Sequence, residues 1–166
     1  MALVKNGQVV ADSFTDITAQ EEIPATGALL VSLEQWQDHW QALLRRREPV
    51  GVLLRSDQHP EIIADDLDEL DLVALHFPVF RDGRAYSYAR LLRQQFGFTG
   101  EIRAVGDVLQ DQLQFMHRVG FDAFEIAGDD PAGTWRAANR EFSVCYQPAG
   151  DDLAPASQMR GSRSAD

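Results

Sequence analysis

The chain has 166 residues, of which 45% are hydrophobic and 25% charged, a composition typical of one ordinary globular domain. Acids outnumber bases by 26 to 15, and the net charge of −11 argues against nucleic acid as a partner, because phosphate binding needs a basic surface. No apolar run approaches the roughly 20 residues of a membrane span, and the first ten residues lack a signal-peptide pattern. The single cysteine, Cys145, suits a reducing compartment and excludes an internal disulfide, a CxxC redox pair and a zinc finger. We therefore expect a cytoplasmic protein that binds neither nucleic acid nor membrane.

Residues 1–27 predict a β-hairpin followed by an irregular arm. Asn6 and Gly7 lie between apolar residues, and this dipeptide is the strongest short hairpin signal because both turn positions need positive φ. Residues 12–26 are polar and predict no regular structure.

A short strand at 27–31 precedes the first predicted helix. Ser32 and Gln35 have the spacing of a capping box, which indicates that a helix begins there. Residues 45–47 are three arginines, which we expect in the last turn, where the helix dipole favours cations. The apolar residues at helical spacing are expected to be buried: Leu33, Trp36, Trp40, Leu43 and Leu44.

Apolar strands and amphipathic helices alternate through the rest of the chain. The expected strands are 50–54, 72–77, 102–105 and 123–126, with a short last one at 144–146; the expected helices are 85–96, 107–119 (capped by Asp107 and closed by Gly120) and 130–142. Parallel strands need helical crossovers. The fold class is therefore α/β: a mostly parallel sheet with interleaved helices, either an open three-layer sheet or half-barrel-like, with an N-terminal β-hairpin. We expect a single α/β domain over 28–147 and a disordered tail over 148–166.

Ligands of such folds bind beyond the carboxyl ends of the strands, which directs attention to the loops 55–60, 78–87, 106–112 and 128–135. Segment 77–103 carries five arginines against two acids, a local charge of +3 that leaves −14 on the rest of the chain. Arg81 and Arg84 lie where a helix is expected to begin, and free backbone N–H groups and the helix dipole favour an anion there.

Two interpretations of this segment stay open. In one, the arginines bind an anion or an acidic partner, since guanidinium groups make bidentate contacts to carboxylates and oxyanions. In the other, Asp82 caps the helix and the arginines pair with the acids of 65–71. The candidate anion- or partner-binding residues are Arg81, Asp82, Gly83, Arg84, Ser87, Arg90, Arg103 and Asp107. Of these, we expect Arg81, Arg84, Ser87 and Asp107 to converge on one cleft.

Motifs for common cofactors and catalytic groups are missing from the sequence. It contains no GxGxxG dinucleotide turn, no GxxxxGK[ST] phosphate loop and no GxSxG nucleophile elbow, and its four histidines show no HExxH spacing. We therefore expect no bound cofactor and no metal, and the motifs name no catalytic residue.

Four stretches of the sequence resemble the DUF934 family, small proteobacterial proteins of uncharacterised function. They are FPVFRDGRAYS at 77–87, LLR and FG at 91–97, GEIRAVGDV at 100–108, and a stretch at 112–124 with Gln112, MHR and GFDAF; the likeness extends over about 29–146. The family motif corresponds to Arg81, Asp82, Gly83, Arg84, Ser87, Arg103 and Asp107. Many relatives carry a cysteine where this chain has Val119, which argues against a thiol mechanism.

The resemblance implies a place in assimilatory sulfite reduction, because family members are usually encoded beside the sulfite reductase haemoprotein. It implies an accessory protein that binds the reductase, sirohaem or a sulfur oxyanion. One alternative is an enzyme of the same pathway, labelled an oxidoreductase, with Asp82 or Asp107 as acid–base. Another is a structural module of the reductase complex without a ligand. A homo-oligomer is compatible with each.

Overall fold

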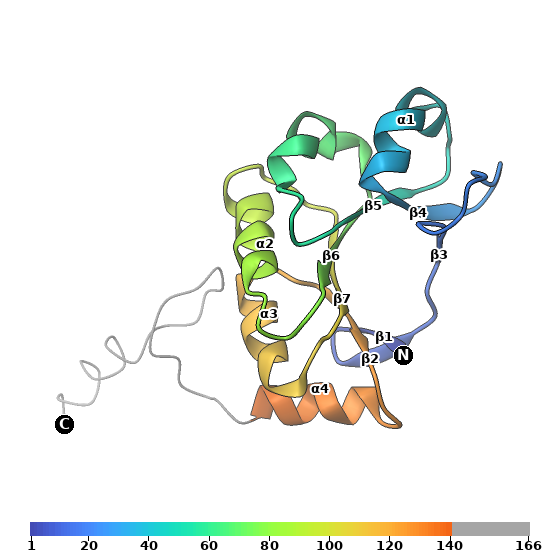
Figure 1. Ribbon diagram of the computed structural model, residues 1–166. Helices are drawn as coiled ribbons and strands as arrows, with labels where there is room; N and C mark the ends of the chain where they lie inside the picture. Colours follow the sequence, from blue (N-terminus) through green and yellow to red (C-terminus); the bar gives the residue numbers. More distant parts are fainter. Residues whose placement is uncertain (141–166) are drawn as a thin grey trace, which may run out of the picture.

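The protein is a curled, mostly parallel eight-stranded sheet with its helices on the convex side (Figure 1), as described over residues 1–140 of a computed structural model. The strands are β1 (Ala2–Lys5), β2 (Gln8–Val10), β3 (Phe14–Asp16), β4 (Ala28–Ser32), β5 (Val50–Leu54), β6 (Leu72–Phe77), β7 (Glu101–Gly106) and β8 (Ala123–Ile126). The α-helices are α1 (Leu33–Leu44), α2 (Arg84–Gln94), α3 (Leu113–Val119) and α4 (Pro131–Arg140), and the 3₁₀ helices are η1 (Pro60–Glu69) and η2 (Gln110–Gln112).

The strand order is β2-β1-β8-β7-β6-β5-β4-β3, and every pair from β3 to β8 is parallel. Strand β1 is antiparallel to both β2 and β8, so the N-terminal hairpin extends the sheet. Residues 11–13 connect the two edge strands, β2 and β3, and cross the open side of the curl (Figure 1). The predicted α/β class is confirmed. Of the two predicted forms, the open three-layer sheet and the half-barrel, the structure has the half-barrel.

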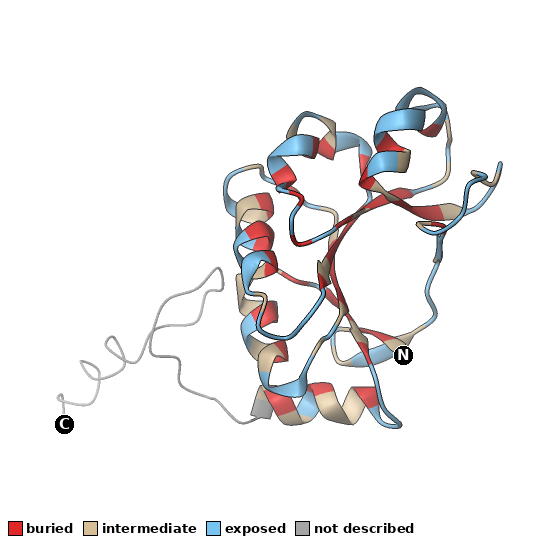
Figure 2. Cartoon of the chain, viewed as in Figure 1, coloured by how far each residue is buried: buried red, intermediate tan, exposed pale blue. Residues whose placement is uncertain are grey.

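Alternate residues of the central strands β4 to β7 face two different cores, because side chains of a strand point to opposite sides of the sheet. In β6, Val73 and Leu75 join the main core between the sheet and the helices. Leu72 and Ala74 face the concave side, where a smaller cluster forms with Leu30 and other residues. The helices are therefore buried on the side facing the sheet and exposed on the other (Figure 2).

The hairpin at Asn6 and Gly7 is confirmed. Both residues have positive φ, 50° and 77°, as a tight turn between right-twisted strands requires. The prediction that 12–26 is irregular is wrong for β3, which pairs with β4 in parallel. This strand is three residues long and mostly exposed, so it has no apolar run that sequence patterns would detect.

Helix α1 begins with the predicted capping box, in which Gln35 N–H donates to Ser32 Oγ and Ser32 N–H donates to Gln35 Oε1. Trp36 is buried as expected, and its indole N–H donates to Asp66 at 2.9 Å. The burial predicted for Trp40 and Leu44 is wrong, because 47% and 37% of these residues are exposed. The buried stripe of α1 consists of Leu33, Trp36 and Leu43 and is narrower than the spacing indicated.

The three arginines of 45–47 lie after α1 and not in its last turn, so that prediction is also wrong. The helix ends at Leu44, and the Arg46 guanidinium donates to the carbonyl oxygens of Pro24 and Gly27. These contacts connect the end of α1 with the segment before β4. The Arg46 side chain is therefore used in a tertiary contact that the dipole argument does not include.

The helix predicted over 107–119 begins later, at Leu113, and Asp107 does not cap it. Gly120 closes it as predicted, with φ 117°. The expected end of the last helix at Phe142, the strand 144–146, the tail 148–166 and Cys145 lie outside the described residues.

Candidate functional site at the carboxyl edge of the sheet

The carboxyl ends of β6 and β7 lie against each other because Gly106 ends β7. Gly106 has φ 94°, and a Cβ at this position would lie 2.4 Å from the carbonyl oxygen of Phe77. The glycine allows Asp107 N–H to donate to that oxygen at 2.8 Å. The Asp107 carboxylate in turn accepts the backbone N–H of Phe80 at 2.8 Å. Asp107 therefore joins the two loops and fixes the position of the β6–α2 loop.

Phe80 is held on both sides of its backbone. Its carbonyl oxygen accepts a hydrogen bond from Gln112 Nε2 at 2.9 Å, in addition to the bond from its N–H to Asp107. The ring nevertheless faces outward, and the Arg81 guanidinium carbon lies 5.3 Å from its centroid, within the range of a cation–π contact. The loop thus presents an aromatic ring and an arginine from a fixed backbone.

Arg84 opens α2 and pairs with Asp82 of the same loop. Its Nε and Nη2 donate to the two oxygens of Asp82 at 2.9 and 2.6 Å, and Nη2 also donates to Ser56 Oγ at 3.0 Å. The hydrogen bonds from Arg84 hold the pKa of the Asp82 carboxyl well below its usual range. Asp82 also accepts the Arg84 N–H at 3.2 Å, whereas the residue at the helix N-cap is Gly83, which makes no side-chain bond.

Of the two interpretations, the pairing of Arg84 with acids of 65–71 is wrong, because its partner is Asp82. Within 65–71, Asp66 accepts from Trp36, and Asp71 accepts the backbone N–H of Val50. Asp82 is not the N-cap residue, which is Gly83. Its carboxylate nevertheless accepts the N–H of Arg84, the first residue of α2, so the predicted capping role is met in part.

Ser87 and Arg90 are exposed and lie along α2. They line an open hollow of about 470 Å³ together with Leu91, Gln94 and Gln95. Arg90 Nε donates to Gln94 Oε1 at 2.8 Å, one helical turn further on. These two candidates therefore belong to the exposed surface of α2.

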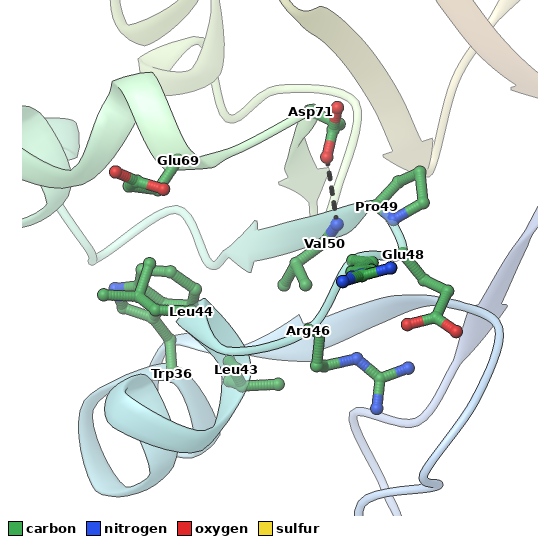
Figure 3. A pocket seen from close by; sticks show the side chains of 10 residues that line it. Trp36, Leu43, Leu44, Arg46, Glu48, Pro49, Val50, Glu69 and Asp71 are labelled. Atoms are coloured by element: carbon green, nitrogen blue, oxygen red, sulfur yellow. Dashed lines mark hydrogen bonds between the residues drawn. The ribbon is translucent and has the colours of Figure 1, made fainter.

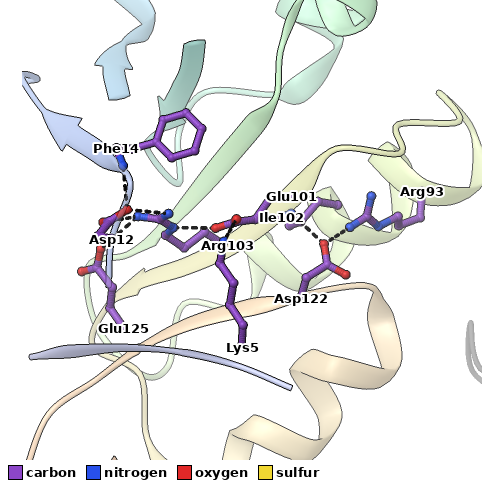
Figure 4. A network of polar contacts seen from close by, with 9 residues as sticks. All are labelled: Lys5, Asp12, Phe14, Arg93, Glu101, Ile102, Arg103, Asp122 and Glu125. Carbon is purple, nitrogen blue, oxygen red and sulfur yellow. Dashed lines mark hydrogen bonds and ion pairs between the residues drawn. The ribbon is translucent and has the colours of Figure 1, made fainter. Parts of the chain in front are cut away.

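Arg103 lies on the concave face of the sheet, beside Asp12 and Glu101 (Figure 4). Only 1% of this residue is exposed. Its Nη1 and Nη2 donate to both oxygens of Asp12 at 2.7 and 3.1 Å, and its Nε donates to Glu101 at 2.8 Å. Glu101 also pairs with Lys5, and Glu125 lies 3.9 Å from Arg103.

The pKa values of the carboxyl groups around Arg103 depend on burial and on the Arg103 guanidinium. Burial would raise the pKa of Asp12, but the hydrogen bonds from Arg103 and from Phe14 N–H lower it below its ordinary value. Burial raises the pKa of Glu125 despite the attraction of Arg103. Asp12 belongs to the segment that crosses the open side of the curl, so Arg103 fixes this segment against the sheet.

The structure thus brings Arg81, Asp82, Gly83, Arg84 and Asp107 to one edge, and it places Ser87 and Arg90 along α2 and Arg103 on the concave face. Sequence reasoning missed the partners Asp12 and Ser56, which lie 91 residues from Arg103 and 28 residues from Arg84. No local pattern indicates such pairs. Sequence reasoning also missed that Phe115 is exposed, although the helical spacing of the apolar residues indicates it. Leu113 and Met116 mark the buried face of α3, and Phe115 lies off that face.

A separate cavity of about 160 Å³ lies at the amino ends of β5 and β6, away from the carboxyl-edge site (Figure 3). Its lining includes Trp36, Arg46, Glu69 and Asp71, where α1 ends and β5 and β6 begin. Asp71 accepts the Val50 N–H here, and Arg46 is bound to backbone carbonyls. Two of its charged groups, Asp71 and Arg46, therefore bond to the backbone, and the cavity is not part of the predicted site.

The described part of the chain contains no group of three or more His, Cys, Asp or Glu side chains arranged to hold a metal ion. Among the helices of residues 1–140, none has the length and apolar character needed to cross a membrane.

A family model described as "Bacterial protein of unknown function (DUF934)" matches residues 51–157, more than half of the chain. The chain belongs to the DUF934 family. The DUF934 match runs from the second residue of β5 through α4 and includes every residue of the carboxyl-edge site, whereas Asp12 lies before it. The resemblance seen in the sequence is thereby confirmed. No curated protein matches this DUF934 chain.

Proposed function

We propose that this DUF934 protein is an accessory protein of assimilatory sulfite reduction that binds an acidic partner through the β6–α2 loop. The observation that carries the proposal is the exposed Arg81, presented by a loop that Asp107 and Gln112 hold in place. The pathway comes from the family resemblance, which associates members with the sulfite reductase haemoprotein. That reductase is therefore the partner we propose.

The distribution of charge favours a protein partner over a small anion. Among residues 1–140, carboxylates pair with three of the five arginines of segment 77–103, namely Arg84, Arg93 and Arg103. Arg90 is bound to an amide and lies along α2. A sulfite or sulfate ion would need several guanidinium groups around one point, because each hydrogen bond to a charged group contributes only about 1.5–3 kcal/mol. A partner protein can instead contact Arg81 together with the other exposed residues of the β6–α2 loop.

The proposal is tested by measuring binding to the purified sulfite reductase haemoprotein at several salt concentrations. We expect the natural protein to bind and Arg81→Glu to bind at least tenfold more weakly at 0.05 M salt, because like charges then face each other. Arg45→Glu is the matched control, since Arg45 is an exposed arginine at the end of α1, and it should bind like the natural protein.

Parallel titrations with sulfite, sulfate and sirohaem separate the small-ligand alternative. We expect these ligands to bind the natural protein and Arg81→Glu equally weakly. Failure of the natural protein to bind the reductase would overturn the proposal. Tight sirohaem binding that Arg81→Glu abolishes would replace the protein partner with the cofactor.

A further inference from the structure

Four exposed apolar side chains surround the point where the β6–α2 and β7–α3 connections meet. They form what we call the carboxyl-edge apolar surface: Val79, Phe80, Leu109 and Phe115, with 54%, 45%, 39% and 51% of each residue exposed. They come from the β6–α2 loop, the β7–α3 connection and α3, and α3 contacts α2 through the rings of Phe115 and Tyr86. Gln112, between Leu109 and Phe115, donates to the carbonyl oxygen of Phe80. Exposed apolar groups that gather in this way mark interaction sites more often than isolated ones do.

The two aromatic rings of this surface are presented by rigid supports. The backbone of Phe80 is bonded at both its N–H and its carbonyl oxygen. The Phe115 ring lies 5.1 Å from that of Tyr86, which in turn lies 5.2 Å from the buried ring of Phe77. Their position is thus fixed before any partner binds, and a preorganised surface loses less conformational entropy on association.

We infer that a partner protein docks on the carboxyl-edge apolar surface by an apolar contact bordered by its own carboxylates, which face Arg81. This inference rests on the proposed function and specifies the contact through which the same partner binds. Buried aromatic groups supply most of the free energy in typical interfaces, whereas a charge at the rim mainly affects the association rate and the salt dependence. The two Phe rings should therefore matter more than Arg81.

Charge complementarity favours an acidic partner over a second copy of this chain. In a two-fold symmetric dimer each surface would meet the same surface, so that Arg81 would approach the other Arg81. A partner with carboxylates around an apolar group would not repel Arg81, and its carboxylates would pair with the arginine when water is excluded.

The test compares Phe80→Ala and Phe115→Ala with the natural protein in binding to the purified sulfite reductase haemoprotein, at 0.15 M and 0.5 M salt. We expect each variant to bind at least tenfold more weakly at both salt concentrations, because apolar contacts are not screened. The loss caused by Arg81→Glu should shrink at 0.5 M. Trp40→Ala is the matched control, since Trp40 is an aromatic residue of similar exposure on α1, and it should bind within twofold of the natural protein.

Thermal melting of each variant checks the fold, and Phe80→Ala is the cleaner variant because Phe115, unlike Phe80, lies against Tyr86 and through it against the buried ring of Phe77. Binding by the natural protein and equally by both Phe variants would overturn the inference and leave the proposed function in place. No binding by the natural protein would overturn both. Self-association in ultracentrifugation that Phe80→Ala abolishes would assign the surface to a second copy and overturn the inference.

Discussion

Replacing Arg103 with methionine tests whether the concave face depends on one buried guanidinium. The residue is 99% buried and makes three hydrogen bonds, two to Asp12 and one to Glu101. Without it, the carboxylates of Asp12, Glu101 and Glu125 would face one another, with Lys5 and the N-terminal amine as the cations left nearby. Removing one partner of a buried ion pair typically costs 3–5 kcal/mol, because the other charge stays buried without compensation.

We therefore expect Arg103→Met to lower the free energy of unfolding by about 3–5 kcal/mol at pH 7, measured by urea denaturation. For a chain of this size each kcal/mol corresponds to about 2–4 °C in Tm. Arg90→Met, which removes an exposed arginine bonded to Gln94, should change the free energy by less than about 0.5 kcal/mol.

The loss in Arg103→Met should become smaller as the pH falls toward 4. The carboxylates left without Arg103 take up protons more readily, and protonation removes their mutual repulsion. A loss below about 1 kcal/mol at pH 7, or a loss that grows at low pH, would refute the reasoning.

Two further predictions concern the loops of the carboxyl edge. Arg55 lowers the pKa of Glu34 from 4.5 to about 2. This pair therefore stabilises the protein above about pH 4.5, and the contribution is lost as the pH falls from 4.5 to 2. In Glu34→Gln the midpoint of urea unfolding should therefore change less with pH over that range than in the natural protein. The same pH dependence in both proteins would contradict this. Gly106→Ala should destabilise the protein more than Gly27→Ala does, because both glycines have φ near 90° but only at 106 would the Cβ meet the Phe77 carbonyl oxygen. Equal losses in thermal melting would show that the approach to Phe77 is unimportant.

Local patterns in the sequence determined most of the secondary structure. Asn6 and Gly7 specify their turn through backbone geometry, and Ser32 and Gln35 specify the start of α1 through their own side chains. The buried parallel strands are visible as continuous apolar runs, because both of their faces are covered. These signals depend on neighbours within a few residues, so the chain itself contains them.

The tertiary structure decided which of the arginines are available. Arg81, Arg84 and Arg103 look alike in the sequence, yet one is exposed, one pairs with Asp82, and one is buried against Asp12, 91 residues away. The curl of the sheet brings Asp12 across the concave face. Pairing between distant residues depends on this three-dimensional path. The periodicity or composition of a single segment does not encode that path. The sequence therefore predicts a cluster of arginines, and only the tertiary structure shows that they lie in different places.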